Sequence, residues 1–422
     1  MYFYNYDKYK NYFEVIKINS NIEKYEKLIT DYARSNYRKM FREPDGYLKY
    51  KYIVPGSTYS DCLWDWDSWL TDIALRNIGT TDELEPYEKG CILNFLEHID
   101  DMGRLPISIR PTSKTLFGDS CDTNTHKPCL AIHALYICRQ INSFEWLKPH
   151  YEKMERFVKF YFDNCRHESG LFFWLDDRGI GVDNDPCTFY RPPKSSASIY
   201  LNCLMYKELS AMAEIANELD FADKHTFYSR EAQILKNAIC EHLWDERNGF
   251  YYSADLNLLP IDPNQQLHAG YPRHWSTLIQ RIDVWSGFMA MWAEIATPEQ
   301  AERMVSENFR NERTFNAPYG IRSLSKLEKM YLIVKSGNPS CWLGPIWGIS
   351  NYMTFDGLVK YGFNSDAREL AEKTITLFGQ DIEKNGELHE YYDPDSGVGV
   401  NNPGFQNWNL LALNMINWLN NN

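Results

Sequence analysis

The sequence has 422 residues, of which 44% are hydrophobic and 24% charged, an ordinary balance for a folded chain. Its formal net charge of −13 disfavours binding to nucleic acids or to anionic membranes, both of which require a basic surface. The sequence contains no run of roughly 18 apolar residues, the length that indicates a membrane-spanning helix. We therefore expect a soluble protein that binds small neutral or polar ligands.

Helical periodicity dominates the chain. Apolar residues recur at i, i+3, i+4 and i+7 in the segments 92–99, 154–161 and 408–419, and each pattern places an apolar stripe on one helix face. Strand patterns are few, and one of them is the segment 249–252 after the turn residue Asn248. The sequence therefore predicts an all-α fold.

Long segments rich in Gly, Pro, Trp and Asp separate the helical stretches. They are residues 52–69, 101–128, 176–198, 262–286, 313–347 and 386–408. Long loops in a compact domain are usually functional, and catalytic residues often lie on loops held by a rigid scaffold. This alternation predicts a toroid of inner and outer helices with the site at one end. No linker interrupts the chain, so we expect a single catalytic domain over 1–422, with 1–50 as a helical lead-in.

The ten cysteines are scattered, with no CxxC pair and no metal-ligand spacing. We interpret them as buried free thiols of a reducing compartment. The segment 1–17 has no apolar run behind a basic start, so it does not resemble a secretory signal. These features predict a cytoplasmic location.

The first chemically informative cluster is the segment 62–69, which holds three Trp and two Asp. Buried carboxylates are costly unless they are hydrogen-bonded, so packing alone does not explain this composition. One interpretation is a helix start with Asp67 or Ser68 as the N-cap. We favour a sugar platform, in which Trp64 and Trp66 contact a pyranose ring and carboxylates accept hydrogen bonds from its hydroxyl groups.

Three further clusters are ambiguous by themselves. The segment 181–186 has the composition of an ordinary turn. The segment 342–347 places two Trp where a loop enters a helix. Glu387 and Glu390 are three residues apart and are expected on one turn, where surface charge is the default interpretation, and His389 is expected to be structural.

No motif for a nucleophile, a phosphate-binding loop or a zinc protease occurs in the sequence. What remains is a set of acidic residues on aromatic-rich loops. Hydrolysis of a glycosidic bond requires two such acidic groups, because one carboxylic acid protonates the leaving oxygen and a second carboxylate lies across the bond from it.

In this order, the clusters resemble motifs of the inverting α-glycosidase clan, related to glycoside hydrolase family 63, which includes trehalases, processing α-glucosidases and mannosylglycerate or glucosylglycerate hydrolases. The segment 66–68 resembles W-D-[ST], and 124–128 lies where the family has Q-P-P. The segment 181–186 resembles G-x-D-N-S-P, 342–347 resembles W-R-G-P-x-W, and 390–397 resembles E-x-Y-x-P-x-T-G.

The resemblance implies an (α/α)6 barrel that hydrolyses a small α-glucoside or α-mannoside, either a glycosylglycerate-like compound or a disaccharide. It implies an exo-acting, inverting mechanism with Asp183 as the general acid and Glu390 as the base. We expect no cofactor or metal ion, because the histidines have no metal-ligand spacing and two carboxylates suffice for the chemistry. The candidate substrate-binding residues are Trp64, Trp66, Asp67, Asn124, His126, Asn184, Trp342, Trp347 and Trp408.

Two residues depart from the family motifs. Leu343 replaces an arginine and Asp185 replaces a serine. Loss of the arginine removes a bidentate partner for a carboxylate and so disfavours an anionic glycerate aglycone. Arg191, Arg273 or Arg322 are the candidates to replace it.

Two other functions stay open at this point. A sugar epimerase or isomerase on the same kind of barrel would use histidines as acid and base, and His126, His268 and His274 lie on loops. A non-catalytic sugar-binding protein would keep the Trp platform but would not need two facing carboxylates. Glu387 is the alternative to Glu390 as the base.

Overall fold

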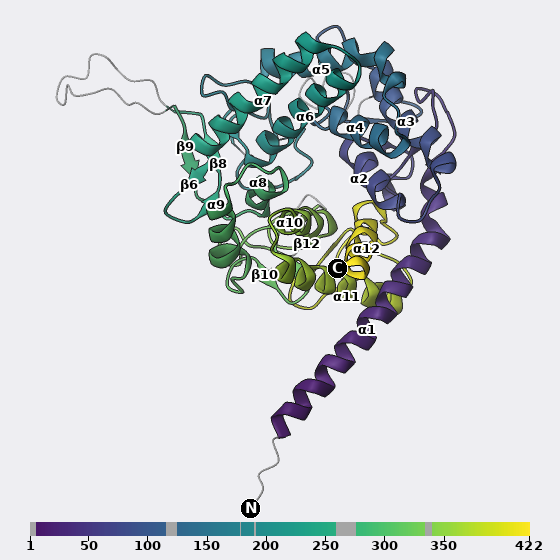
Figure 1. Ribbon diagram of the computed structural model, residues 1–422, viewed down its shortest axis with the longest axis vertical. Coiled ribbons are helices and arrows are strands. Elements are labelled where there is room, and N and C mark those ends of the chain that lie inside the picture. The colour runs from purple at the N-terminus through teal and green to yellow at the C-terminus, as the bar shows by residue number, and fades with distance from the viewer. Residues whose placement is uncertain (1–5, 115–124, 178, 190, 259–275, 334–339) are drawn as a thin grey trace, which may run out of the picture.

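The computed structural model describes residues 6–114, 125–177, 179–189, 191–258, 276–333 and 340–422. Helices dominate this part of the chain (Figure 1). The α-helices are α1 (Tyr6–Asn36), α2 (Asp65–Leu75), α3 (Thr81–Glu97), α4 (Leu130–Ile141), α5 (Tyr151–Asn164), α6 (Ile199–Glu218), α7 (Ala222–His242), α8 (Met289–Trp292), α9 (Pro298–Arg303), α10 (Gly348–Lys360), α11 (Asn364–Asn385) and α12 (Ala412–Asn421).

Shorter elements connect these helices. The 3-10 helices are η1 (Tyr37–Met40), η2 (Ser57–Tyr59), η3 (Glu145–His150), η4 (Trp285–Phe288) and η6 (Asn407–Leu411), and η5 (Met304–Phe309) is a π-helix. The strands are β1 (Phe41–Arg42), β2 (Tyr52–Ile53), β3 (Leu63–Trp64), β4 (Ser108–Ile109), β5 (Ser196–Ala197), β6 (Trp244–Asp245), β7 (Phe250–Tyr251), β8 (Ser253–Asp255), β9 (Leu278–Gln280), β10 (Asn316–Ala317), β11 (Gly320–Ile321), β12 (Ile346–Trp347) and β13 (Tyr391–Tyr392). These strands form small antiparallel sheets of two or three strands.

The even-numbered helices contact one another in a closed circuit. Helix α2 contacts α4, and contacts continue through α6, α8, α10 and α12, which returns to α2. Figure 1 shows this ring from one end, with α3, α5, α7 and α11 on its outer side. The chain therefore alternates between an inner and an outer position as it runs around the ring, and its last helix lies beside its first inner one.

The apolar periodicity of the sequence predicts the positions of these helices correctly. The segments 92–99, 154–161 and 408–419 lie in α3, in α5 and in η6 with α12, and only the last residues of the first segment extend past α3. The expected strand at 249–252 is also confirmed, because β7 pairs with β6 in a hairpin. These patterns succeed because each stripe or hairpin is buried on one side.

The expected N-cap at Asp67 or Ser68 is wrong. Helix α2 begins at Asp65, and its N-cap, Trp64, makes no side-chain capping bond. Strand β3 pairs with β4 as far as Trp64, opposite Ser108, so the extended chain ends there and the N-cap lies three or four residues earlier than expected. Asp67 and Ser68 consequently lie in the first turn of the helix and are buried.

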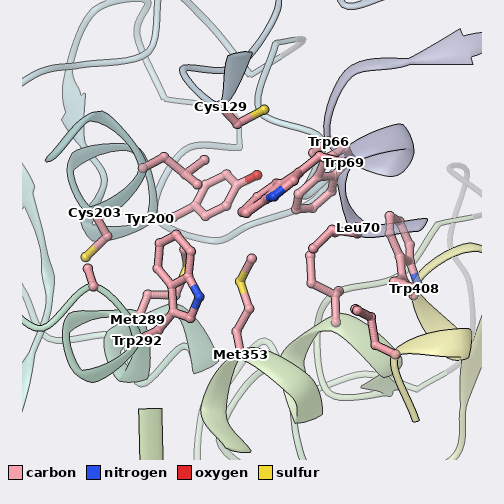
Figure 2. Packing of buried hydrophobic residues seen from close by; sticks show 14 of the residues in the cluster. Trp66, Trp69, Leu70, Cys129, Tyr200, Cys203, Met289, Trp292, Met353 and Trp408 are labelled. Carbon is pink, nitrogen blue, oxygen red and sulfur yellow. The ribbon is translucent and has the colours of Figure 1, made fainter. Parts of the chain in front are cut away.

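Side chains of the inner helices fill the middle of the ring. In Figure 2, Trp69 and Leu70 of α2, Trp292 of α8 and Met353 of α10 point toward one another, and the rings of Trp69 and Trp292 are 6.1 Å apart. Trp66 lies beside this core and also borders the pocket described below. The ring is thus a packed core that supports a site at its end.

The nine cysteines of the described ranges are free thiols, and all but the half-buried Cys240 are buried. The interpretation of these nine as free thiols is confirmed. In the described ranges, no helix has the length and apolar character needed to cross a lipid bilayer.

Candidate active site

A pocket of about 470 Å³, its open mouth included, brings together residues that are far apart in the sequence. The lining residues are Tyr59, Trp64, Trp66, Asp67, Ile107, Lys127, Gly181, Asp183, Ser340, Trp342, Trp347, Glu390 and Trp408. They come from five of the six long loops expected to carry the site. Much of the sixth, 262–286, lies outside the described residues.

Two short sheets position pocket residues. Strand β12 pairs with β13 so that Trp347 lies opposite Tyr391, and Glu390 directly precedes β13. Strand β3 pairs with β4 so that Trp64 lies opposite Ser108, immediately before α2. A strand pair fixes backbone register, so these contacts set which side chains meet at the pocket.

Glu390 is 4% exposed and accepts two side-chain hydrogen bonds. Tyr59 Oη donates to Oε1 at 3.4 Å and Asn401 Nδ2 donates to Oε2 at 3.1 Å. Burial raises the pKa of Glu390 to about 7, and the charge of Asp183 acts in the same direction, whereas the amides of Asn402 and Asn401 oppose the shift. Glu390 is therefore a carboxyl group that titrates near neutral pH, which suits a general base.

Glu387, the alternative base, is half-buried and does not line the pocket. Helix α11 ends at Asn385, and Gly386 adopts φ 76°. The expectation that Glu387 and Glu390 share one helical turn is therefore wrong, because the chain has already left the helix.

Asp183 lies on a tight loop between two fixed points. Gly181, two residues before it, adopts φ 74°, and a Cβ there would lie 2.6 Å from Lys127 Cε. Asn184, one residue after it, is buried, and its Oδ1 accepts a hydrogen bond of 2.7 Å from the backbone N–H of Trp342. Asn184 thus anchors the Asp183 loop to the Trp342 loop and does not itself line the pocket.

Four tryptophans form an aromatic wall. The rings of Trp342 and Trp347 stack at 3.8 Å with an interplanar angle of 4°. The ring of Trp408 lies 5.9 Å from that of Trp347 and 5.3 Å from that of Trp66. Trp342 also stacks on Trp285, and Trp347 on Tyr391, so the wall is a rigid aromatic stack whose apolar surface suits the C–H groups of a sugar.

Two buried indole donors at the pocket have no partner among the described residues. They are Nε1 of Trp64 and Nε1 of Trp408, both on residues that line the pocket. Buried donors in native proteins are almost always paired. A ligand oxygen in the pocket is a suitable acceptor for either.

The pocket also contains a buried charge cluster, which lies beside Trp66. Asp67 accepts a hydrogen bond from Asn407 Nδ2, and burial, reinforced by the charge of Asp65, raises the pKa of Asp67 well above its ordinary value. Lys127 Nζ lies 3.1 Å from each carboxylate oxygen of Asp65 and 4.9 Å from the ring centroid of Trp66. Lys127 therefore brings a paired positive charge to the pocket.

His126 lies away from the pocket, packed edge-on against the rings of Phe95 and Phe157. Burial lowers its pKa to about 4. Asn124, the other candidate from this loop, lies outside the described residues, as do His268 and His274. The titratable groups that the structure places at the pocket are thus carboxylates, one lysine and one tyrosine.

The candidate arginines have other partners where they are described. Arg322 donates to Asp395 at 2.9 Å and to the Asn316 carbonyl at 2.6 Å, and Arg191 pairs with Asp255. Arg273 lies outside the described residues, and Leu343 does not line the pocket. The arginine missing at Leu343 is therefore not replaced at the pocket by Arg191 or Arg322.

Sequence reasoning missed Tyr59, Ile107, Lys127, Gly181 and Ser340 as lining residues. All five lie in the long loops predicted from the sequence, and Ser340 precedes the Trp342 cluster by two residues. Lys127 was passed over because a lysine in a loop is ordinarily exposed. Within the described ranges, no group of three or more His, Cys, Asp or Glu side chains is arranged to hold a metal ion.

The chain resembles known glycoside hydrolases. Residues 61–408 match the mannosylglycerate hydrolase MGH1-like glycoside hydrolase domain. A cytosolic neutral trehalase of Kluyveromyces lactis is 27% identical over 248 residues, 55% of this chain and 30% of that protein. A mannosylglycerate hydrolase of Thermus thermophilus is 27% identical over 237 residues, 55% of this chain and 48% of that protein. The matches thus span about a third to a half of these relatives' length.

A solved structure shows the same fold. A family 63 mannosylglycerate hydrolase of Thermus thermophilus, in complex with glucose, superposes with a TM-score of 0.66 at 19% sequence identity. The superposition covers 88% of this chain and 96% of that one.

Proposed function

Because this chain belongs to the mannosylglycerate hydrolase MGH1-like glycoside hydrolase family, we propose that it hydrolyses the α-glycosidic bond of a small α-glucoside or α-mannoside with inversion. The observation that carries the proposal is the presence of Asp183 and Glu390 in one pocket. The pKa of Glu390 responds to the charge of Asp183, so the two groups interact. Glycoside hydrolysis requires such a pair of carboxyl groups.

In the proposed reaction, Asp183 is protonated and donates its proton to the glycosidic oxygen. Glu390 is ionised and removes a proton from a water molecule as that water attacks the anomeric carbon from the opposite face. Tyr59 and Asn401 hold the Glu390 carboxylate in place through their hydrogen bonds. The products are the free sugar, with inverted anomeric configuration, and the aglycone alcohol.

The rest of the pocket supports a sugar ligand. Trp342, Trp347 and Trp408 provide apolar ring surface, Asp67 provides a carboxyl group, and the indole N–H groups of Trp64 and Trp408 are donors without described partners. A pocket with apolar walls and a few polar groups fixes the orientation of its ligand. We further propose that the enzyme is exo-acting and takes a short substrate.

We also propose that the ring is an (α/α)6 barrel forming one catalytic domain, which acts in the cytoplasm without a metal ion or other cofactor. The closed circuit of even-numbered helices supports the barrel, and a continuous buried core supports the single domain. The free buried thiols, together with a relative named as cytosolic, support the location. The carboxylate pair suffices for the chemistry.

The proposal is tested by incubating the protein with α-glucosides and α-mannosides of glycerate, glycerol, glucose and galactose. Release of free sugar from at least one of them is expected. If the protein releases no sugar and instead interconverts free sugars, the epimerase function replaces this one.

A further inference from the structure

Lys127 is an unusual lining residue because the whole side chain is buried. It is 0% exposed, whereas lysines are almost never fully buried unless they are paired. Its partner is Asp65, which is 1% exposed and accepts hydrogen bonds from both the side-chain ammonium and the backbone N–H of Lys127. The proposed reaction assigns no role to this ion pair.

The surroundings of Lys127 connect two parts of the pocket. On one side, Asp65 and Trp66 belong to the first turn of α2, which also carries Asp67. On the other side, Lys127 packs against Gly181, where an added Cβ would lie 2.8 Å from Nζ. Gly181 lies two residues before Asp183, and a Cβ there would also lie 3.3 Å from Trp66 Cζ2, so the side chains of Lys127 and Trp66 together fill the space between the start of α2 and the Asp183 loop.

We propose that Lys127 is a positioning residue: its ammonium links Asp65 and Trp66 of α2 to the Gly181 loop and thereby sets the placement of Asp183 relative to Asp67. This inference rests on the proposed function only in assuming that Asp183 reacts. Lys127 also opposes the effect of burial on the pKa of Asp67, which favours the ionised, hydrogen-bond-accepting form of that group.

The first test compares Lys127→Met, which keeps the length of the side chain but removes its charge, with the double variant Lys127→Met/Asp65→Asn. The single variant leaves a buried carboxylate without its partner, so a clear loss of thermal stability is expected. The double variant removes both charges, and we expect it to recover most of that stability. Its kcat is nevertheless expected to fall at least tenfold, because no ammonium group then lies between Asp65 and the Asp183 loop.

The second test keeps the charges of Lys127 and Asp65 and changes the space between Lys127 and the Asp183 loop. Gly181→Ala introduces a methyl group where Lys127 now lies, and we expect kcat to fall at least tenfold. Gly362→Ala is the matched control, since Gly362 has a similar φ of 78° but nothing lies within 4 Å of an added Cβ. Gly362→Ala introduces a similar backbone strain at a position outside the pocket, so it is expected to retain kcat.

Crystal structures of the wild type and the double variant separate positioning from a purely structural role. A shift of residues 181–185 relative to α2 is expected in the variant. An unmoved loop overturns the proposal, as does a kcat within about twofold of the wild type in the double variant or in Gly181→Ala. If the wild type hydrolyses no α-glycoside, the proposed function fails, and the crystal structures alone decide the role of Lys127.

Discussion

The charge of Asp183 raises the pKa of Glu390, although the two residues are more than 200 positions apart in the sequence. Asp183 is held between Gly181 and the Asn184 anchor, and Glu390 directly precedes β13. Two carboxyl groups that interact across one pocket ionise in a coupled manner, so one tends to keep its proton when the other is charged. This coupling fits an acid and base pair, whereas the choice of Asp183 as the acid and Glu390 as the base follows from their places in the family motifs.

The first prediction concerns the two carboxyl groups. Asp183→Asn and Glu390→Gln are each expected to reduce kcat by about 10²–10⁴-fold or more, because each keeps the shape of the side chain but removes proton transfer. The measurement is kcat on a substrate found in the screen, with thermal melts to verify folding. Glu387→Gln is the matched control and is expected to retain activity. An inactive Glu387→Gln beside an active Glu390→Gln would show that the base is misassigned.

The second prediction is a pH dependence. Burial raises the pKa of Glu390 to about 7, and a base must be ionised to act. The value of kcat/KM is therefore expected to rise with pH through about 7, because this ratio reports the ionisation of the free enzyme. A pH series on the wild type measures it. A rise centred near the ordinary glutamate pKa, close to pH 4.5, would contradict the raised pKa of Glu390.

The third prediction concerns stability. The folded pKa of Glu390 is raised from 4.5 to about 7, so its contribution to stability is present at low pH and is lost as pH rises through 7. Above pH 7 the wild type bears a buried charge that costs about 3 kcal/mol relative to its unfolded state, at about 1.4 kcal/mol for each pKa unit. Glu390→Gln avoids this cost, so its Tm relative to the wild type is expected to be higher at pH 8 than at pH 5. Equal differences at the two pH values would argue against a shifted pKa.

The fourth prediction is that catalysis needs no metal ion, because two carboxyl groups suffice for the proposed mechanism. Dialysis of the protein against a chelator is expected to leave kcat unchanged. A loss of activity that Ca²⁺ or Mg²⁺ restores would contradict it.

The helices could be predicted because their apolar stripes are local patterns. The start of α2 could not, since it depends on the pairing of β3 with β4, whose partners Trp64 and Ser108 are separated by the whole of α3. A capping rule considers only neighbouring residues, so it chose Asp67 or Ser68 when the strand had already fixed Asp65 as the first helical residue.

The site could be predicted where an aromatic or acidic cluster marked it. Trp64, Trp66, Asp67, Trp342, Trp347 and Trp408 line the pocket with Asp183 and Glu390. Lys127 and Tyr59 were missed because their importance comes from partners distant in sequence, Asp65 and Glu390. His126 was chosen for its residue type, yet the structure packs it between two phenylalanine rings.

The most direct test of the central claim is the anomeric configuration of the first product. If Glu390 acts through water, an α-glycoside must release the β-anomer first. Proton NMR in the first minutes of the reaction, before mutarotation, measures this, and the account predicts the β-anomer. Release of the α-anomer would mean that a carboxylate attacks the anomeric carbon itself, and would contradict both the role of Glu390 and the inverting mechanism.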